Sequence, residues 1–412
     1  MSTQQSLAGL TVLEFSHTIM GPCAGLLLAD LGADVIKIEP APEGDHTRRL
    51  PGFAAGFFAA FNRNKRSVAI NLKTDEGRAV LHRLVTSADI VVENYGPGTM
   101  ERLGCGEAVL RDLNPRLIYL ALKGFLSGPW QDRPALDEVV QFQSGLAYMT
   151  GPPGQPLRAG ASVVDILGAV FGVTGVLAAL REREQTGSGQ RVGSALFESA
   201  AFLMASHMAA AATTGQQVPP MTARRGAWGI YDPFTFQHDE QLFIGVTSDP
   251  QWMRFCRVFD FQDLAADTRL DTNSSRSEHR DWLIPELQSR LQPLSLEHAQ
   301  SLCEQADISW ASVARPEDLF TNPQLLDTGG LLEVALATAA GSQADSVRLP
   351  ALPLEFGATR SRTTLDRQPP AAGEHTLEIL TEAGLSHDEI VALVNAAAVR
   401  VHESTPPPSQ TS

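Results

Sequence analysis

The sequence predicts an α/β fold, with a large domain built on a parallel sheet and a second, smaller α/β domain. Between residues 10 and 120, short runs rich in β-branched residues alternate with longer helical runs, the pattern expected where helices connect parallel strands. Around Gly226 this alternation gives way to a different pattern. The 412 residues, 43% of them hydrophobic, are enough for two domains with separate cores.

In the first domain the strands and helices follow one another in order. Apolar runs predict strands at residues 12–15, 35–38, 90–93, 117–122 and 191–195. Helical patterns occupy residues 21–31 and 74–87. In an open parallel sheet the ligand usually lies at the carboxyl ends of the strands. The walls of the site are therefore expected in the loops after Phe15, Glu39, Glu93 and Leu122.

The remainder of the chain suggests a second domain and a return to the first. Strands are expected at 234–236, 241–246 and 349–356, and helices at 285–291, 374–382 and 386–397. The last two helices are able to pack back on the first domain. The tail is rich in proline, serine and threonine and is expected to be disordered. The predicted organisation is a large domain at 1–205 completed by 331–400, a linker at 206–225, a small domain at 226–330 and a tail at 401–412.

Composition excludes several classes of partner. The formal net charge is −15, so nucleic acids and anionic membranes would repel the chain. The first residues lack a secretory signal, and the apolar run 166–180 is shorter than the roughly 20 residues that a bilayer requires. Cysteines occur singly, at 23, 105, 256 and 303. This spacing predicts reduced thiols, no metal site and a cytoplasmic protein.

Several nucleotide and hydrolase motifs are absent. The segment 187–193 is rich in glycine, but it follows a predicted helix and precedes a strand, the reverse of a dinucleotide-binding turn. The sequence also contains no GxxxxGK loop, no HExxH and no GxSxG. We therefore expect neither a nicotinamide enzyme nor a member of those hydrolase and kinase classes.

Asp165 lies where a loop of small residues runs into the apolar helix. One interpretation is structural, with Ser162 as the N-cap and Asp165 three residues later, its anion stabilised by the helix N-terminus. The other is chemical, because an ionised carboxylate flanked by small residues is also an accessible nucleophile. The two interpretations are compatible, and spacing does not decide between them.

Basic and polar residues mark a second candidate region. The run 62–67, Asn-Arg-Asn-Lys-Arg-Ser, is the strongest basic cluster of this acidic chain. It predicts either a solvated surface turn or a seat for phosphate groups. The turn that begins at Asn94 can offer backbone N–H groups to a ligand or serve only as a tight turn. His17 follows the first strand, at an expected wall of the site, although a lone histidine is more often structural.

Together these segments resemble the class III CoA-transferases, the formyl-CoA and carnitine CoA-transferase family. The resemblance rests on segments that occur in the family's order through nearly the whole chain: 7–15, 32–39, 64–67, 92–98, 137–141, Asp165, 186–190 and 373–376. It implies a large Rossmann-like domain, a small domain and a homodimer of interlinked chains. It implies Asp165 as the nucleophile and a CoA site formed with Lys65, Arg66, Asn94, Lys123 and His17, with no cofactor beyond CoA itself.

The resemblance also implies a reaction. Asp165 would carry CoA as an aspartyl thioester between small carboxylic acids, and the segments 123–129, 135–141 and 147–153 are most similar to the branch acting on mesaconate, citramalate, itaconate or succinate. Arg48, Arg49 or Arg158 could hold a second substrate carboxylate. One alternative is an α-methylacyl-CoA racemase, but Leu136 stands where that branch has a histidine. Another is a degenerate CoA-binding protein, for which Ile19 leaves room in place of a glutamine.

Overall fold

The computed structural model describes residues 5–223, 227–336 and 345–402. They form two compact units, one built from both ends of the chain, up to Thr222 and from Pro323 onward, and the other spanning Ala223–Asn322. The small unit thus ends at Asn322 rather than near residue 330. Most of the expected tail, residues 403–412, lies outside the described residues. Part of the expected linker is helical, since α10 spans Ala205–Thr214.

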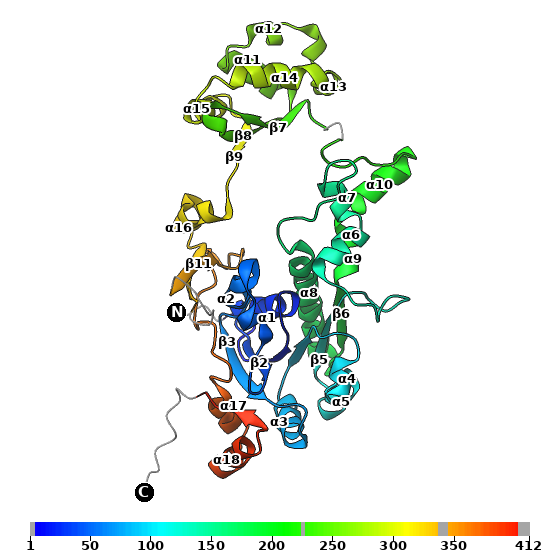
Figure 1. Ribbon diagram of the computed structural model, residues 1–412, viewed down its shortest axis with the longest axis vertical. Coiled ribbons are helices and arrows are strands. Elements are labelled where there is room, and N and C mark those ends of the chain that lie inside the picture. Colours follow the sequence, from blue (N-terminus) through cyan, green and yellow to red (C-terminus); the bar gives the residue numbers. More distant parts are fainter. Residues whose placement is uncertain (1–4, 224–226, 337–344, 403–412) are drawn as a thin grey trace. The chain divides into compact units, whose positions relative to one another are not determined.

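The first unit is organised around a seven-stranded sheet in the order β12-β3-β2-β1-β4-β5-β6 (Figure 1). Neighbouring strands are parallel except for the antiparallel pair β12 and β3. From β1 the chain first adds β2 and β3 on one side of the sheet, and it then adds β4, β5 and β6 on the other side. Ligands of open α/β sheets bind where the order reverses, here between β1 and β4. The strands are β1 (Thr11–Phe15), β2 (Asp34–Pro40), β3 (Lys65–Ile70), β4 (Ile90–Glu93), β5 (Ile118–Lys123), β6 (Arg191–Ala195) and β12 (Val399–Arg400).

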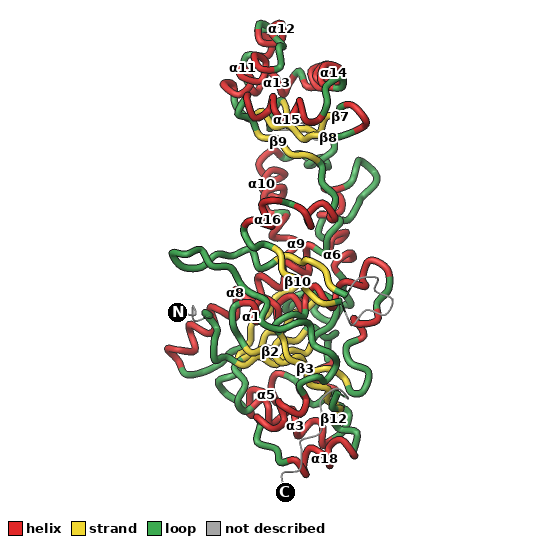
Figure 2. Tube along the Cα trace, turned by 90° about the vertical axis from the view of Figure 1, so that its left-hand side faces the viewer, coloured by secondary structure: helices red, strands yellow, loops and turns green. Residues whose placement is uncertain are grey.

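Helices cover both faces of this sheet because successive strand residues point to opposite sides. Val12 and Val92 pack in one core with residues of α1 and α8, whereas Leu13 and Val91 belong to a second core with α3, α5, α17 and α18. Figure 2 shows α1 and α8 on one side of the sheet and α3, α5 and α18 on the other. The helices of this unit are α1 (Met20–Asp30), α2 (Phe57–Phe61), α3 (Asp75–Val85), α4 (Thr99–Arg102), α5 (Glu107–Leu113), α6 (Asp137–Gln143), α7 (Leu146–Thr150), α8 (Val163–Thr186), α9 (Leu196–Leu203), α10, α16 (Pro323–Asp327), α17 (Thr376–Glu382) and α18 (His387–Asn395).

The strands expected at 12–15, 35–38, 90–93, 117–122 and 191–195 are confirmed, but β3 and β12 were not expected. The sequence indicated a surface turn or phosphate seat at 62–67, whereas Lys65 to Ile70 form a fully buried strand. The strand expected at 349–356 is also misplaced. It occurs as β11 (Ser346–Pro350), paired with β10 (Leu331–Ala335). The two C-terminal helices do return to the sheet, where α17 packs on β3.

Helix α8 contains the apolar run predicted at 166–180, and this 24-residue helix is long and apolar enough to cross a membrane by length and composition alone. One of its faces packs on α1, β5 and β6. Near its end, Arg183 is paired with Asp89 at 2.9 Å. These contacts are those of a core helix.

The second unit is a three-stranded antiparallel sheet with its own helices and its own core, which includes Trp252 and Phe255. Arg276 is completely buried in it and is paired with Asp249 at 2.6 Å. Its elements are β7 (Ile230–Thr235), β8 (Gln241–Val246), β9 (Ser309–Ser312), α11 (Asp249–Val258), α12 (Gln262–Ala265), α13 (Asn273–Glu278), α14 (Arg280–Leu291) and α15 (Leu296–Gln305).

Candidate functional site

Two cavities adjoin at the carboxyl ends of the central strands. The larger, of about 780 Å³, lies beyond β2 and β3, and the other, of about 570 Å³, contains Asp165. Both are lined by His17, Tyr95 and Gly96, so these residues form a shared wall. We call them the nucleotide-side cavity and the aspartate cavity. Their position is the one predicted from the strand ends at Phe15, Glu39, Glu93 and Leu122.

Asp165 is half-buried at the third position of α8, but the capping pair expected from its spacing is wrong. Ser162 is the N-cap residue, yet its side chain makes no capping hydrogen bond. The cap comes instead from Asp137 at the start of α6. Its Oδ2 accepts the N–H groups of Val164 at 2.9 Å and of Asp165 at 3.0 Å. Asp137 is in turn fixed by the Gln141 amide, which donates to Oδ1 at 2.5 Å.

This arrangement raises the pKa of Asp165 to about 7. Burial is the larger cause, because it penalises the charged carboxylate, and the neighbouring Asp137 carboxylate is the smaller one. The sequence had suggested an anion stabilised by the helix N-terminus; the structure shows one whose ionisation is opposed. A carboxylate that titrates near neutral pH in a cavity is typical of a reactive group.

The loop between β1 and α1 is held rigidly against the cavity. Asn94 binds both backbone groups of His17, accepting its N–H at 3.1 Å and donating to its carbonyl at 3.0 Å. Thr18 has a φ of 65°, a strained conformation for a β-branched residue, and its N–H donates to the Thr47 hydroxyl at 2.8 Å. A Cβ on Gly21 would lie within 2.7 Å of the Asn94 side chain. The helix can therefore approach this loop only because residue 21 is glycine.

His17 itself lies between two aromatic rings. Its ring is stacked on Tyr95 with centroids 5.7 Å apart and is 5.0 Å from the ring of His46. Burial lowers the pKa of His17, and His46 lowers it further. The imidazole is therefore neutral at physiological pH and accepts or donates one hydrogen bond with the Thr18 hydroxyl, 2.8 Å away.

Lys65 and Arg66 were expected at a CoA site, but neither lines either cavity. Lys65 is fully buried and pairs with Glu14 at 2.7 Å. Burial lowers its pKa to about 8, Lys37 adds to this, and Glu14 opposes it. Arg66 pairs with Asp34 at 2.5 Å and with two α17 carboxylates, those of Glu378 at 2.8 Å and Glu382 at 2.7 Å. Both cations are therefore paired with carboxylates of the protein itself.

Other expected cations differ in their surroundings. Lys123 does line the aspartate cavity, but its Nζ is paired with Glu93 at 2.7 Å. Arg48 is held by Glu39 through Nε at 2.9 Å and Nη2 at 2.6 Å. Arg158 is paired with Glu138 outside both cavities. Of the arginines proposed for a second carboxylate, only Arg49 reaches a cavity, and it is the nucleotide-side one.

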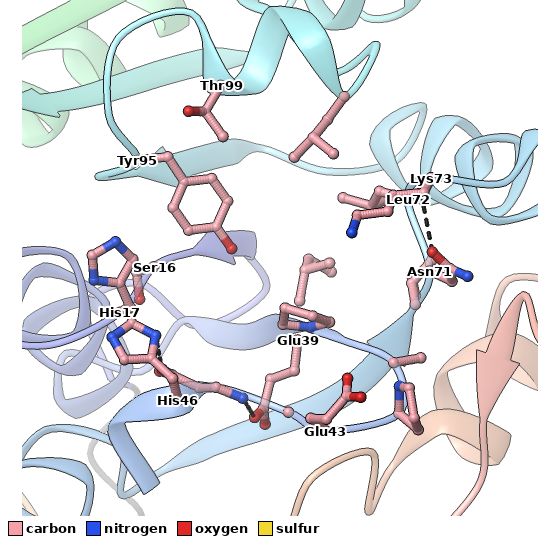
Figure 3. Close-up of a pocket in the computed structure, with 18 of the residues that line it drawn as sticks. Ser16, His17, Glu39, Glu43, His46, Asn71, Leu72, Lys73, Tyr95 and Thr99 are labelled. Atoms are coloured by element: carbon pink, nitrogen blue, oxygen red, sulfur yellow. Dashed lines mark hydrogen bonds and ion pairs between the residues drawn. The ribbon is translucent and has the colours of Figure 1, made fainter. Parts of the chain in front are cut away.

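The nucleotide-side cavity combines aromatic, polar and basic side chains. Figure 3 shows Tyr95 and Lys73 pointing into it, with Asn71 beside Lys73 and with Glu39 and Glu43 on the opposite wall. Glu39 is paired with Arg48 and accepts a hydrogen bond from the Ser67 hydroxyl. Among the described residues Lys73 has no ion-pair partner. Lys73 follows the basic run 62–67 along the chain, and its place shortly after the end of β3 brings it into this cavity.

Similarity to known proteins identifies the family of this chain. Residues 7–376 match the model of CoA-transferase family III. This chain belongs to that family. The CoA-transferase is 33% identical to the succinate–glutarate CoA-transferase of Agrobacterium fabrum, over 91% of this chain and 95% of the other. It is also 33% identical to the succinyl-CoA:mesaconate CoA-transferase of Haloarcula marismortui, over 92% and 97% of the two chains. A CaiB/BaiF family protein from Brucella suis superposes with a TM-score of 0.81 at 29% identity, covering 92% of this chain and all of that one.

Three residues in or beside the two cavities of this CoA-transferase have positions or contacts that the sequence did not suggest. Asp137 was noted only as a family marker, yet it caps α8 and raises the pKa of Asp165. Thr47 was not noted, although it holds the Thr18 backbone. Arg133 was not noted either, and it lines the aspartate cavity. Such roles depend on contacts between separate segments, so only the conformation of the loops could reveal them.

Proposed function

We propose that this enzyme moves CoA between small dicarboxylic acids of four or five carbons, through a covalent aspartyl-CoA at Asp165. The observation that carries this proposal is a carboxylate with a pKa near 7 in an accessible cavity. The printed names of two relatives, which act on succinate with glutarate or mesaconate, support the class of acids. Four buried, free thiols support a reducing, cytoplasmic setting.

The reaction proceeds by four substitutions. An Asp165 oxygen attacks the donor thioester carbonyl, its C–S bond breaks, and CoA thiolate leaves a mixed anhydride. The thiolate then attacks the Asp165 carboxyl carbon, so that the donor acid departs as a carboxylate and aspartyl-CoA remains. The acceptor carboxylate attacks that thioester and expels the thiolate, which finally attacks the acceptor carbonyl and releases Asp165. Covalent capture divides one difficult exchange into easier steps.

No proton is gained or lost in these four steps, so the reaction requires no general acid or base. Only the ionised form of Asp165 is a nucleophile, and a neutral His17 beside it is no obstacle because no general acid is required. The thiolate must stay within reach of the carboxyl carbon between steps. The rigid loop held by Asn94 and Thr47 supplies a fixed wall for that purpose.

We assign the CoA moiety to the two adjoining cavities. The nucleotide part lies in the nucleotide-side cavity, where Lys73 and Arg49 are available to phosphate groups and Tyr95 offers an aromatic face. The pantetheine arm passes His17 and Asn94 into the aspartate cavity, beside Lys123. Lys65 and Arg66 take a structural part in this arrangement, not a phosphate-binding one.

The enzyme is proposed to act as a homodimer. Ile166, Val170 and Leu177 on α8 and Phe202 on α9 are large apolar side chains that remain exposed, Phe202 by 67%. An apolar surface of this kind usually marks a protein interface. A second copy of the chain is the partner that the family resemblance implies, with the two chains interlinked.

A racemase is less well supported. At the position before Asp137, Leu136 lines the aspartate cavity, and its side chain has no group that can donate or accept a proton. Racemisation requires a second acid or base on the opposite face of the α-carbon. Transfer of α-deuterium to solvent without an added acid would nevertheless restore this alternative.

The proposal is tested by trapping the intermediate. Incubation with succinyl-CoA and then hydroxylamine should convert Asp165 to a hydroxamate, detected by peptide mass spectrometry, while Asp165→Asn gives none. The nearby buried Cys23 is the internal control for the site of labelling. Exchange of labelled succinate into succinyl-CoA should accompany the label. Transfer that proceeds without modification of Asp165 would refute the covalent mechanism.

A further inference from the structure

Arg133 is the cationic side chain of the aspartate cavity that has no carboxylate partner. Among the described residues lining this cavity, Lys123 is already paired with Glu93. The imidazole of His17 is uncharged, because burial lowers its pKa. Arg133 makes no side-chain hydrogen bond and no ion pair with any residue that the structure describes; its backbone N–H donates to the Trp130 carbonyl. The exposed Arg133 side chain therefore contributes a guanidinium with free donors to the lining of the aspartate cavity.

An aromatic platform holds this guanidinium in place. Its central carbon lies 4.9 Å from the centroid of the Trp130 ring. Trp130 is itself packed edge-on against Phe125 and Phe197, at 5.7 and 5.5 Å. Stacking restrains the plane of an arginine and leaves the N–H groups on its edge free, which is the form that binds a carboxylate with two parallel hydrogen bonds.

The aspartate cavity needs such a cation if its substrate is a dicarboxylic acid, which carries a second negative charge. Asp132, Asp137 and Asp165 all line it, so its carboxylates would repel a substrate that carries a second negative charge. A monocarboxylic acyl group presents no such charge once it is joined to CoA. The unpaired arginine is thus required only by acids with a distal carboxylate.

We propose that Arg133 binds the distal carboxylate of the dicarboxylic acyl group and so sets the preference of the enzyme for dicarboxylates. This inference rests on the proposed CoA transfer and extends it to a residue that selects the substrate. Arg48, Arg49 and Arg158, which the sequence offered for this role, do not line the aspartate cavity. Arg133 contacts the substrate away from the reacting atoms, so its loss should affect one class of acid and leave the chemistry intact.

The test compares two thioesters with four-carbon acyl groups that differ in the distal carboxylate. Exchange of labelled succinate into succinyl-CoA and of labelled butyrate into butyryl-CoA is measured for the wild type, Arg133→Met and Arg133→Lys. Arg181→Met is the matched control, since Arg181 is exposed near the end of α8 and pairs with Glu184. CoA affinity is measured by calorimetry for every variant.

Arg133→Met should lower kcat/KM for succinate exchange by roughly 10- to 150-fold, mainly through KM, with butyrate exchange and CoA affinity unchanged. Arg133→Lys should recover part of this loss, and Arg181→Met should match the wild type. Equal losses for both acids, or a weaker affinity for free CoA, would overturn the inference by placing Arg133 on CoA or in the fold. A wild-type enzyme that exchanges neither acid would instead refute the proposed function.

Discussion

Asp137→Asn tests how the residue that caps α8 raises the pKa of Asp165. The substitution removes the charge facing Asp165 while keeping an oxygen that can accept the N–H groups of Val164 and Asp165. The new amide group would face the Gln141 amide, which already uses its oxygen to accept the Ala159 N–H at 2.8 Å. One buried hydrogen bond is lost, and we expect the free energy of unfolding to fall by about 1–3 kcal/mol.

The same substitution should also lower the pKa of Asp165, and this second effect is the one that tests the role of Asp137. This pKa rises from 3.8 to about 7 in the wild type, with burial as the larger cause and Asp137 as the smaller. The Asp137 charge therefore accounts for at most half of that rise, roughly 1–1.5 pKa units or roughly 2 kcal/mol. In the proposed mechanism only ionised Asp165 reacts, so the acidic limb of the pH–rate profile should move from about 7 to roughly 5.5–6.

The assay measures the exchange rate at pH 6 and at pH 8 and takes the ratio of the two. A change in the maximal rate at high pH affects both rates equally and cancels in this ratio. The ratio should rise from roughly 0.1 in the wild type to roughly 0.6 in Asp137→Asn. Asp132→Asn is the control, because Asp132 lines the same cavity without being a cause of the raised pKa. A limb that stays in place, or that moves equally in both variants, would refute the assigned effect of Asp137.

Three further predictions follow from the same contacts. Asp165→Asn should stabilise the fold more at pH 7.5 than at pH 4, because a carboxyl with a raised folded pKa costs stability as pH rises through that range; equal melting shifts at both pH values would contradict this. Lys65→Met should destabilise by about 3–5 kcal/mol in urea with little loss of CoA affinity, whereas Lys73→Met should do the reverse; weaker CoA binding in Lys65→Met alone would restore Lys65 to the site. Val170→Asp should give a monomer in light scattering while the secondary structure stays unchanged, because it places a charge on the exposed apolar face of α8; a dimer of unchanged mass would show that this face is not the interface.

Local patterns predicted most of the sheet and the edge that holds the site. Apolar runs such as 90–93 identify strands because a strand covered on both faces must be apolar throughout. Strand β3 was missed because it begins with Lys65, Arg66 and Ser67, whose charges and hydroxyl are satisfied only in the folded chain. One partner, Glu378, lies more than 300 residues away, and no local pattern contains that information.

The same limit explains the cap of α8. Spacing alone suggested Ser162, because a serine three residues before an acid is a common capping signal. The loop before α8 instead places Val164 and Asp165 over Asp137, from another helix. The place of Asp165 at the start of an apolar helix was therefore predictable from its sequence context, whereas the carboxylate that caps this helix and raises the pKa of Asp165 was not.

The antiparallel pairing of Val399 and Arg400 with β3 has a consequence for biosynthesis. Until β12 leaves the ribosome, one border of the growing sheet offers free backbone groups to other nascent chains. At roughly 5–20 residues per second the delay between the two strands is roughly 15–65 s. Ribosome-bound chains that stop before residue 399 should therefore depend on chaperones far more than full-length ones.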